Sequence, residues 1–240
     1  MMLQVEGLRS GYGRVPVLHG IDLSVAAGEI VLVLGANGAG KSTLLRTVAG
    51  FIRPTAGRIT FDGADIAGLP PEEMARRGLR LVLDGHRVFP NLSVADNIRI
   101  GAAWRGGRPD FDELAGAALE MFPILRAKLR EPARNLSGGQ QQMVVLAQAF
   151  AARPKLLLCD EPSLGLAQAL MPQILAFLRH WARSGTGILI VEQQIGATLS
   201  AADRAVVIER GAVRLAGTAE ALRHDRQVQD IYLGIRQEPA

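Results

Sequence analysis

The sequence has few of the features that mark secreted or membrane-spanning proteins. Cys159 is the only cysteine, so no intrachain disulfide can form, and this usage suits a reducing cytosol. No apolar run approaches the roughly 18 to 20 residues that a membrane-spanning helix needs. Residues 1–6 also lack the charged and apolar regions of a secretion signal. We therefore expect a chain that neither enters nor crosses a membrane by itself.

Blocks of like charge are also absent. The chain has 27 Lys and Arg against 23 Asp and Glu, and the net charge of +4 is scattered, without a run of about five like charges. Such a balance suits an anionic nucleotide or a membrane surface, and it gives no reason to expect nucleic acid as a partner. With 240 residues, 48% of them hydrophobic, and no internal repeat, the chain is long enough for one large globular domain or two small ones.

A glycine-rich segment connects a buried strand pattern to a helical pattern. The apolar run Ile30–Leu34 precedes it, and the helical pattern of residues 44–49 follows it. The segment comprises Gly35, Ala36, Asn37, Gly38, Ala39, Gly40, Lys41, Ser42 and Thr43. Glycines let backbone N–H groups approach phosphate oxygens, and the dipole of the following helix reinforces this anion site. The arrangement predicts a phosphate-binding loop rather than a glycine-rich turn without chemical consequence.

The last three side chains of this loop predict its ligand. Lys41 can reach the β- and γ-phosphates, the Ser42 hydroxyl is placed to ligate Mg²⁺, and Thr43 is placed to hydrogen-bond phosphate. We therefore predict that the chain binds a nucleoside triphosphate with Mg²⁺. Tyr12, flanked by small residues, could stack on the base as a flat ring, although ordinary packing is the more common role of a single tyrosine.

Two carboxylates end a second buried strand pattern, which runs from Lys155 to Pro162. Open α/β sheets bind their ligands at the carboxyl ends of such strands. Asp160 is placed to hold the Mg²⁺ shell, and Glu161 to orient or deprotonate an attacking water. An acidic pair at a strand end is often only a helix cap or a solvated turn. The upstream phosphate loop favours the catalytic interpretation.

Ser137 is a good N-cap for a largely apolar helix over residues 143–151, and it is followed by Gly138, Gly139 and Gln140. A second helix N-terminus is thereby offered to an anion. For an isolated Ser-Gly-Gly sequence, a capped helix without a ligand is the better interpretation. The role of residues 137–140 therefore depends on the other motifs of the chain and on the order in which they occur.

The remaining patterns outline an α/β chain. Half-buried antiparallel strands are predicted at 3–8 and 18–25, and a further short strand at 58–61. A short helix is predicted at 71–78, a strand at 79–83, and helical segments out to about Leu129. A long helix over 167–183, interrupted by Pro172, precedes strands at 187–191, 205–209 and 212–215 and a polar helical tail.

The phosphate loop, Leu136–Gln140 and Leu157–Pro162, in this order and spacing, resemble the ATP-binding subunit of an ABC transporter from end to end. The resemblance implies an α/β P-loop NTPase fold with a mostly parallel core sheet, an antiparallel β subdomain and a helical insertion. It implies one nucleotide-binding domain over 1–240. Residues 1–84 and 151–240 would form the ATPase core with the β subdomain, and about 85–150 the helical signature subdomain.

Looser strings at 88–94, 161–167, 191–194 and 232–234 are similar to the smaller of the two ATPase subunits of high-affinity branched-chain amino acid importers. This resemblance implies an ATPase peripheral to the cytoplasmic face of the cell membrane. Its partners would be two transmembrane permease subunits, a second ATPase subunit, identical or different, and indirectly a periplasmic or extracellular solute-binding protein. Amides, urea or other small solutes stay open as cargo. A non-transport ABC ATPase that acts on a soluble partner and a regulatory module that only binds ATP are the alternatives.

The resemblance also implies a role for each site residue. Tyr12 would stack on adenine with Val17 beside it, and Glu161 would polarise the hydrolytic water. The loop from 35 to 43 and Asp160 would hold MgATP, while Ser137, Gly138, Gly139 and Gln140 would contact the ATP of a facing subunit. Hydrolysis would then require two ATPase subunits arranged head to tail.

Three positions depart from the wider family pattern. Asp84 stands where a glutamine usually contacts Mg²⁺, and its shorter side chain can still coordinate metal, directly or through a water. Gln193 replaces the usual histidine at the γ-phosphate, so it can donate a hydrogen bond but cannot carry positive charge. Ala167 lacks the customary aspartate across the dimer interface. We therefore expect slow hydrolysis at this site, or the weaker site of an asymmetric heterodimer.

Overall fold

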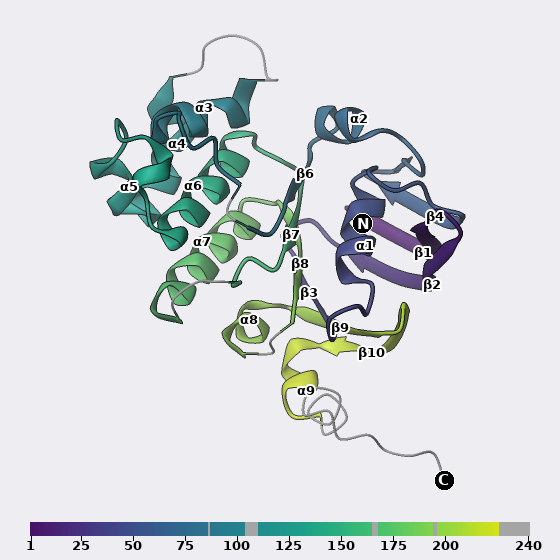
Figure 1. The fold of residues 1–240 in the computed structure, drawn as a ribbon. Helices are drawn as coiled ribbons and strands as arrows, with labels where there is room; N and C mark the ends of the chain where they lie inside the picture. The colour runs from purple at the N-terminus through teal and green to yellow at the C-terminus, as the bar shows by residue number, and fades with distance from the viewer. Residues whose placement is uncertain (86, 104–109, 165–167, 194–195, 226–240) are drawn as a thin grey trace.

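The fold is built on two β-sheets with helices packed between and beside them (Figure 1). The computed structural model describes residues 1–85, 87–103, 110–164, 168–193 and 196–225. A six-stranded sheet has the order β10-β9-β3-β8-β7-β6, and a four-stranded sheet has the order β2-β1-β4-β5. Both the mostly parallel core sheet and the antiparallel sheet predicted from the family resemblance are therefore confirmed.

The six-stranded sheet brings the carboxyl ends of its central strands together. Its strands are β3 (Ile30–Leu34), β6 (Leu79–Val82), β7 (Leu156–Asp160), β8 (Gly187–Glu192), β9 (Arg204–Glu209) and β10 (Ala212–Thr218). All pairs are parallel except the β9–β10 hairpin. Leu34 pairs with Glu192, and Asp160 pairs with Val191. The loops that follow β3, β7 and β8 therefore emerge side by side at one edge of the sheet.

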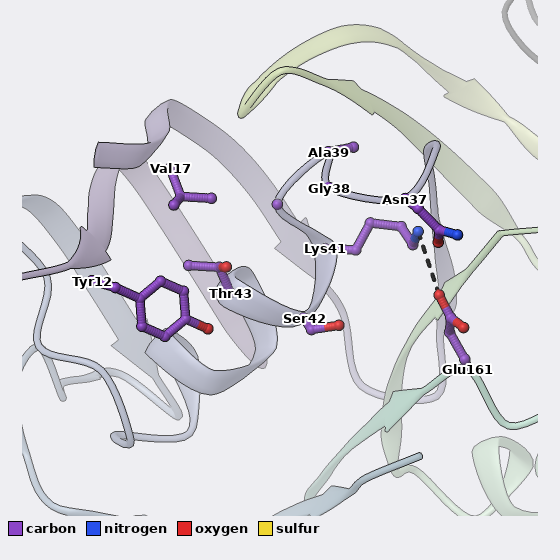
Figure 2. Close-up of a pocket in the computed structure, with 10 residues that line it drawn as sticks. Tyr12, Val17, Asn37, Gly38, Ala39, Lys41, Ser42, Thr43 and Glu161 are labelled. Carbon is purple, nitrogen blue, oxygen red and sulfur yellow. Dashed lines mark ion pairs between the residues drawn. The ribbon is translucent and has the colours of Figure 1, made fainter. Parts of the chain in front are cut away.

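The antiparallel sheet consists of β1 (Leu3–Tyr12), β2 (Val15–Val25), β4 (Ala56–Phe61) and β5 (Ala64–Asp65). The first two strands are longer than the alternating sequence pattern predicts. Their pairing shifts register between Val5 and Leu8 and again near Ser10, and each shift interrupts the alternation of buried and exposed residues. The hairpin that they form carries Tyr12 and Val17 toward the phosphate loop (Figure 2).

The helices fall on the two sides of the core sheet. They are α1 (Lys41–Val48), α2 (Pro71–Arg76), α3 (Val94–Ala102), α4 (Phe111–Met121), α5 (Pro123–Ala127), α6 (Gly138–Ala151), α7 (Met171–Arg183), α8 (Gly196–Ala201) and α9 (Ala219–Arg223). Two short 3₁₀ turns cover Ala133–Asn135 and Gln168–Leu170. Figure 1 shows α3 to α7 gathered on one side of the core sheet, with α1 and the antiparallel sheet on the other.

β3 lies between two hydrophobic clusters because both of its faces are buried. Ile30, Leu32 and Leu34 pack in a cluster with residues of α3, α4, α6 and α7. Val31 and Val33 pack in a second cluster with residues of β1, β2 and α1. This explains why β3 reads in the sequence as a continuous apolar run rather than as an alternating strand. The strand that leads into the phosphate loop is thus held from both sides.

The prediction of a long helix interrupted by Pro172 is wrong. Helix α7 begins at Met171, and Pro172 lies in its first turn. A proline is tolerated there because backbone N–H groups of the first turn have no partner within the helix. Ala167, and with it the expected start of that helix, lies outside the described residues, as do Gln194 and residues 226–240. Among the described residues, none of the helices is both long and apolar enough to span a bilayer.

Candidate active site

The phosphate loop predicted from the sequence connects β3 to α1, and glycine is required at two of its positions. A Cβ atom on Gly35 would lie 2.4 Å from the backbone oxygen of Ile208, so the close approach of β9 excludes a side chain. Gly40 has a φ of 106° and is the N-cap of α1, without a side-chain cap hydrogen bond. The first N–H groups of α1 are therefore not occupied by a capping side chain, as an anion site at a helix N-terminus requires.

The ammonium group of Lys41 lies between the phosphate loop and the loop after β7. Its Nζ donates to the backbone oxygens of Gly35, at 2.8 Å, and Ala36, at 3.3 Å. It also lies 3.5 Å from Oε1 of Glu161, the ion pair marked in Figure 2. The lysine side chain is 5% exposed, and that of Glu161 is 17% exposed. The two charged groups that the sequence places in nucleotide binding and water activation are therefore brought together.

Ser42 and Asp160, the neighbours of Lys41 and Glu161 in the chain, are also in contact. The Ser42 hydroxyl donates to Oδ1 of Asp160 at 3.0 Å. Burial raises the pKa of the Asp160 carboxyl, and the hydrogen bond from Ser42 opposes that rise. The negative charges of Asp84 and Glu161 also raise the Asp160 pKa. A hydroxyl and carboxylate oxygens are the hard donors that Mg²⁺ prefers, so this group fits the predicted metal.

Glu161 adopts an unusual backbone conformation. Its φ is 44°, in the left-handed region that non-glycine residues seldom adopt and that costs roughly 1–2 kcal/mol. Hydrogen bonds hold this turn, because the Glu161 N–H donates to the Val191 oxygen at 3.0 Å and the Leu164 N–H donates to the Glu161 oxygen at 3.0 Å. The chain turns sharply after β7, and Figure 2 shows the Glu161 side chain directed toward Lys41. Strain of this kind is common at functional sites.

A pocket of about 310 Å³ lies beside these groups. It is lined by Tyr12, Val17, Asn37, Gly38, Ala39, Gly40, Lys41, Ser42, Thr43 and Glu161. Figure 2 shows Tyr12 and Val17 at one end and the Lys41–Glu161 pair at the other. The Tyr12 side chain is about half exposed, and its hydroxyl accepts a hydrogen bond from Arg46 at 3.2 Å. The end with Tyr12 and Val17 suits the base of a nucleotide, and the end with the Lys41 ammonium beside the phosphate loop suits its phosphates.

Some predicted site residues do not line the pocket. Gly35 and Ala36 lie outside the lining, but their carbonyl oxygens accept hydrogen bonds from Lys41, which is part of it. Asp84 and Gln193 are both partly buried and follow β6 and β8 in the chain. Asp160 does not line the pocket either, and it contacts the lining through its hydrogen bond with Ser42. The negative charge of Asp84 contributes to the raised pKa of Asp160. The direct contacts predicted for Asp84 and Gln193 stay predictions.

The Ser137 segment forms the capped helix start that the sequence predicts. Ser137 is the N-cap of α6, and its hydroxyl accepts from the Gln140 N–H at 3.4 Å while the Gln140 side chain accepts from the Ser137 N–H at 3.2 Å. This reciprocal pair is a capping box. None of the residues from Ser137 to Gln140 lines the pocket of the same chain. Their contact with a nucleotide on a facing subunit stays a prediction.

Glu192 is a part of the site region that sequence reasoning missed. It is the last residue of β8, is 2% exposed, and accepts two hydrogen bonds from Ser163. The available signal was a carboxylate at the end of an apolar strand pattern, the same signal that identified Asp160. Its neighbour Ser163 could not be identified from the sequence, because the contact depends on β7 and β8 being adjacent in the sheet.

Comparison with known proteins identifies relatives of the chain. A family model described as ABC transporter matches residues 18–164. The high-affinity branched-chain amino acid transport ATP-binding protein BraG of Pseudomonas aeruginosa is 39% identical over 97% of this chain and 100% of its own length. The Fe(3+) ions import ATP-binding protein FbpC of Streptomyces coelicolor is also 39% identical, over 90% of this chain but 62% of its own length.

A crystal structure of the ADP conformation of an ATP-binding cassette from an ABC transporter has the same architecture. The two chains superpose with a TM-score of 0.85 at 27% sequence identity. The match covers 97% of this chain and 98% of that cassette. The similarity in fold therefore extends over the core sheet, the antiparallel sheet and the helices.

Proposed function

The chain belongs to the ABC transporter family, as the ATPase subunit of an importer, and we propose that it couples ATP hydrolysis to the uptake of branched-chain or related amino acids. The observation that supports hydrolysis most strongly is the pocket in which Lys41 and Glu161 meet beside Ser42 and Asp160. A site that only binds nucleotide has no need of Glu161 beside the predicted metal ligand.

Each side chain has a defined task in the proposed reaction. The phosphate-loop N–H groups and Lys41 bind the phosphates, and Lys41 exchanges its contact with Glu161 for one with the γ-phosphate. Ser42, Asp160 and Asp84 would hold Mg²⁺, which neutralises negative charge on the phosphates. Glu161, released from the ion pair, orients and polarises the attacking water. Gln193 donates a hydrogen bond to the γ-phosphate, and Tyr12 stacks on adenine with Val17 beside it.

We further propose that the complete site requires a second ATPase subunit. Ser137, Gly138, Gly139 and Gln140 lie at the start of α6 and away from the pocket of their own chain, which leaves them available to the γ-phosphate of ATP on a facing subunit. Binding of ATP would close the two subunits, and hydrolysis would let them separate. The helical insertion beside Phe89 and Pro90 would transmit this movement to two permease subunits at the cytoplasmic face of the membrane. A solute-binding protein outside the cell would take part indirectly.

The proposed cargo depends on the relatives rather than on the pocket. BraG, named for branched-chain amino acid transport, matches this chain over its entire length, whereas the iron importer subunit is equally identical but extends well beyond the match. The chain therefore agrees in length with the amino acid transport subunit and not with the longer iron importer subunit. Amides, urea and other small solutes are the alternative cargo, because transported solutes contact other subunits of such systems.

Affinity purification of the tagged chain from solubilised membranes of its own cell tests the proposal. We expect to recover two membrane subunits and a second ATPase, and we expect the complex to hydrolyse ATP. A Lys41→Ala chain should assemble in the same way but support less hydrolysis. Recovery of the chain alone, or together with a soluble partner or nucleic acid, would instead favour a non-transport ATPase.

A further inference from the structure

Glu192 carries a buried carboxylate that the proposed reaction does not use. The residue is 2% exposed at the carboxyl end of β8 and does not line the nucleotide pocket. Its Oε1 accepts from the Ser163 N–H at 3.0 Å, and its Oε2 accepts from the Ser163 hydroxyl at 2.8 Å. Both carboxylate oxygens are therefore engaged by one residue of a neighbouring loop.

That neighbouring loop is the one that carries Glu161. Ser163 follows Glu161 by two positions, and the Glu161 N–H donates to the oxygen of Val191, the residue before Glu192. The turn after β7 is thus attached to the end of β8 at two points, by backbone at Glu161 and by the Glu192 side chain at Ser163. Two attachments of this kind restrict the direction in which the Glu161 side chain can point.

The turn needs such support because Glu161 has a left-handed backbone conformation, which is unfavourable for a residue with a side chain. The same strand end continues directly into Gln193, the residue expected at the γ-phosphate. Whatever fixes Glu192 to Ser163 therefore also fixes the relative positions of Glu161 and Gln193. A displacement of about 1 Å can cost roughly a hundredfold in the rate of a catalysed reaction.

Burying the Glu192 carboxylate costs desolvation free energy. Burial raises the pKa of Glu192, and the negative charge of Glu161 adds to that rise. The hydrogen bonds from Ser163 and one from the backbone N–H of Gln193 oppose it. In the described part of the chain its partners are hydrogen-bond donors rather than a cation. A neutral side chain of similar size would stabilise the fold at lower cost. The carboxylate does, however, provide two acceptors at fixed spacing for the two donors of Ser163.

We propose that Glu192 is a positioning residue for ATP hydrolysis, whose carboxylate holds the Glu161–Ser163 turn against the end of β8 so that Glu161 and Gln193 face the nucleotide in one fixed arrangement. This inference rests on the proposed ATPase function. It assigns Glu192 no contact with ATP or water. Loss of the attachment should therefore lower kcat while leaving ATP affinity unchanged.

Four variants of the chain, each purified in its complex, test this role. In Glu192→Ala both acceptors are lost, and we expect kcat to fall about tenfold or more. Glu192→Gln can accept from the Ser163 N–H and donate to its hydroxyl, so kcat should stay within about threefold of wild type. Ser163→Ala keeps the backbone hydrogen bond from position 163 but loses the one from the hydroxyl, and it should give an intermediate value. Glu209→Ala, at the end of β9 with its carboxylate on the exposed Arg214, is the control and should change nothing.

The equilibrium affinity for a fluorescent ATP analogue and the thermal unfolding midpoint are measured on the same samples. We expect affinities within about twofold of wild type for all four variants, and rescue of kcat by glutamine but not by alanine. The positioning role is overturned if Glu192→Ala keeps the wild-type kcat, if glutamine fails as alanine does, or if kcat falls only together with ATP affinity. If Glu192→Ala does not fold, Ser163→Ala carries the same test. Failure of the proposed function is distinguishable, since the wild-type complex would then hydrolyse no ATP.

Discussion

At the scale of single residues, Lys41 makes a contact with Glu161 that the proposed reaction replaces by one with the γ-phosphate of ATP. Its ammonium is shared between two loop carbonyls and Glu161, and Lys41 is not a member of either hydrophobic cluster of the described residues. We predict that Lys41→Ala abolishes ATP binding, measured by calorimetry, while the unfolding midpoint changes by only a few degrees. Lys155→Ala, which removes a half-exposed lysine paired with Asp62, is the matched control and should bind ATP normally. Unchanged affinity in Lys41→Ala would refute the assignment of the loop.

The buried Glu192 carboxyl predicts a dependence of stability on pH. Its pKa is raised in the folded protein above the ordinary value of 4.5, chiefly by burial, so the folded state binds the proton more tightly than the unfolded state. The favourable contribution of the protonated group is complete below pH 4.5 and is lost as pH rises through the raised pKa. The free energy of unfolding of wild type relative to Glu192→Gln should therefore decrease between pH 4.5 and pH 8. Urea titrations that show a constant or increasing difference would contradict this.

Gln193 and Asp84 predict a weak catalytic site. An amide at position 193 cannot place a positive charge on the γ-phosphate as a histidine can. We expect Gln193→His to raise the turnover of the assembled complex, and Glu161→Gln in this chain to remove less than half of the complex's turnover. Steady-state phosphate release measures both. A loss of half the turnover in Glu161→Gln, together with no gain in Gln193→His, would argue against this interpretation.

At the scale of elements, we predict that alanine substitutions at two helical glycines change the free energy of unfolding in opposite directions. A Cβ atom on Gly101 of α3 would lie 1.9 Å from the backbone oxygen of Gln148 in α6, whereas Gly116 of α4 has open space. Gly101→Ala should force α3 away from α6 and cost about 1–3 kcal/mol of stability. Gly116→Ala should stabilise the chain by up to about 1 kcal/mol, because alanine favours the helix. Urea unfolding measures both, and equal effects of the two changes would show that α3 and α6 are not packed this closely.

The sequence predicted best those elements whose signals are local. The phosphate loop, the strand before it and the capped start of α6 each depend on residues within about ten positions, and all three are present. The lengths of β1 and β2 were underestimated because register shifts break their alternation. The start of α7 was misplaced because a proline in a first turn resembles an interruption inside a helix.

Contacts between elements could not be predicted from local patterns. The strand order brings β3, β8 and β7 side by side although they are far apart in the chain. The Lys41–Glu161 pair and the Ser42–Asp160 hydrogen bond follow from that order. The sequence connected these four residues through their expected roles at a nucleotide and its Mg²⁺, but it did not predict their contacts with one another. No sequence pattern pointed to the hydrogen bonds between Glu192 and Ser163, because they depend on β7 and β8 being adjacent in the sheet.

At the scale of the whole molecule, the fold places its chemistry at one edge of a sheet buried on both sides. β3 contributes to both hydrophobic clusters, so the phosphate loop begins from a strand with little freedom to move. The antiparallel sheet supplies Tyr12 and Val17. Lys41 lies at the start of α1, just after the loop that follows β3, and Asp160 and Glu161 lie at the end of β7 and in the turn after it. Residues Ser137 to Gln140 lie at the start of α6, outside the lining of the nucleotide pocket. This division suits a subunit that binds ATP itself and completes the site of a second subunit.

Uptake of labelled leucine by liposomes that contain the purified complex tests most directly whether this chain powers an importer. With the solute-binding protein outside and ATP inside, we predict accumulation that depends on ATP hydrolysis and is lost when this chain carries Lys41→Ala. Liposomes with the Lys155→Ala chain should accumulate leucine as wild type does. Accumulation that persists with Lys41→Ala, or hydrolysis of ATP without uptake of any amino acid, would contradict the proposed function.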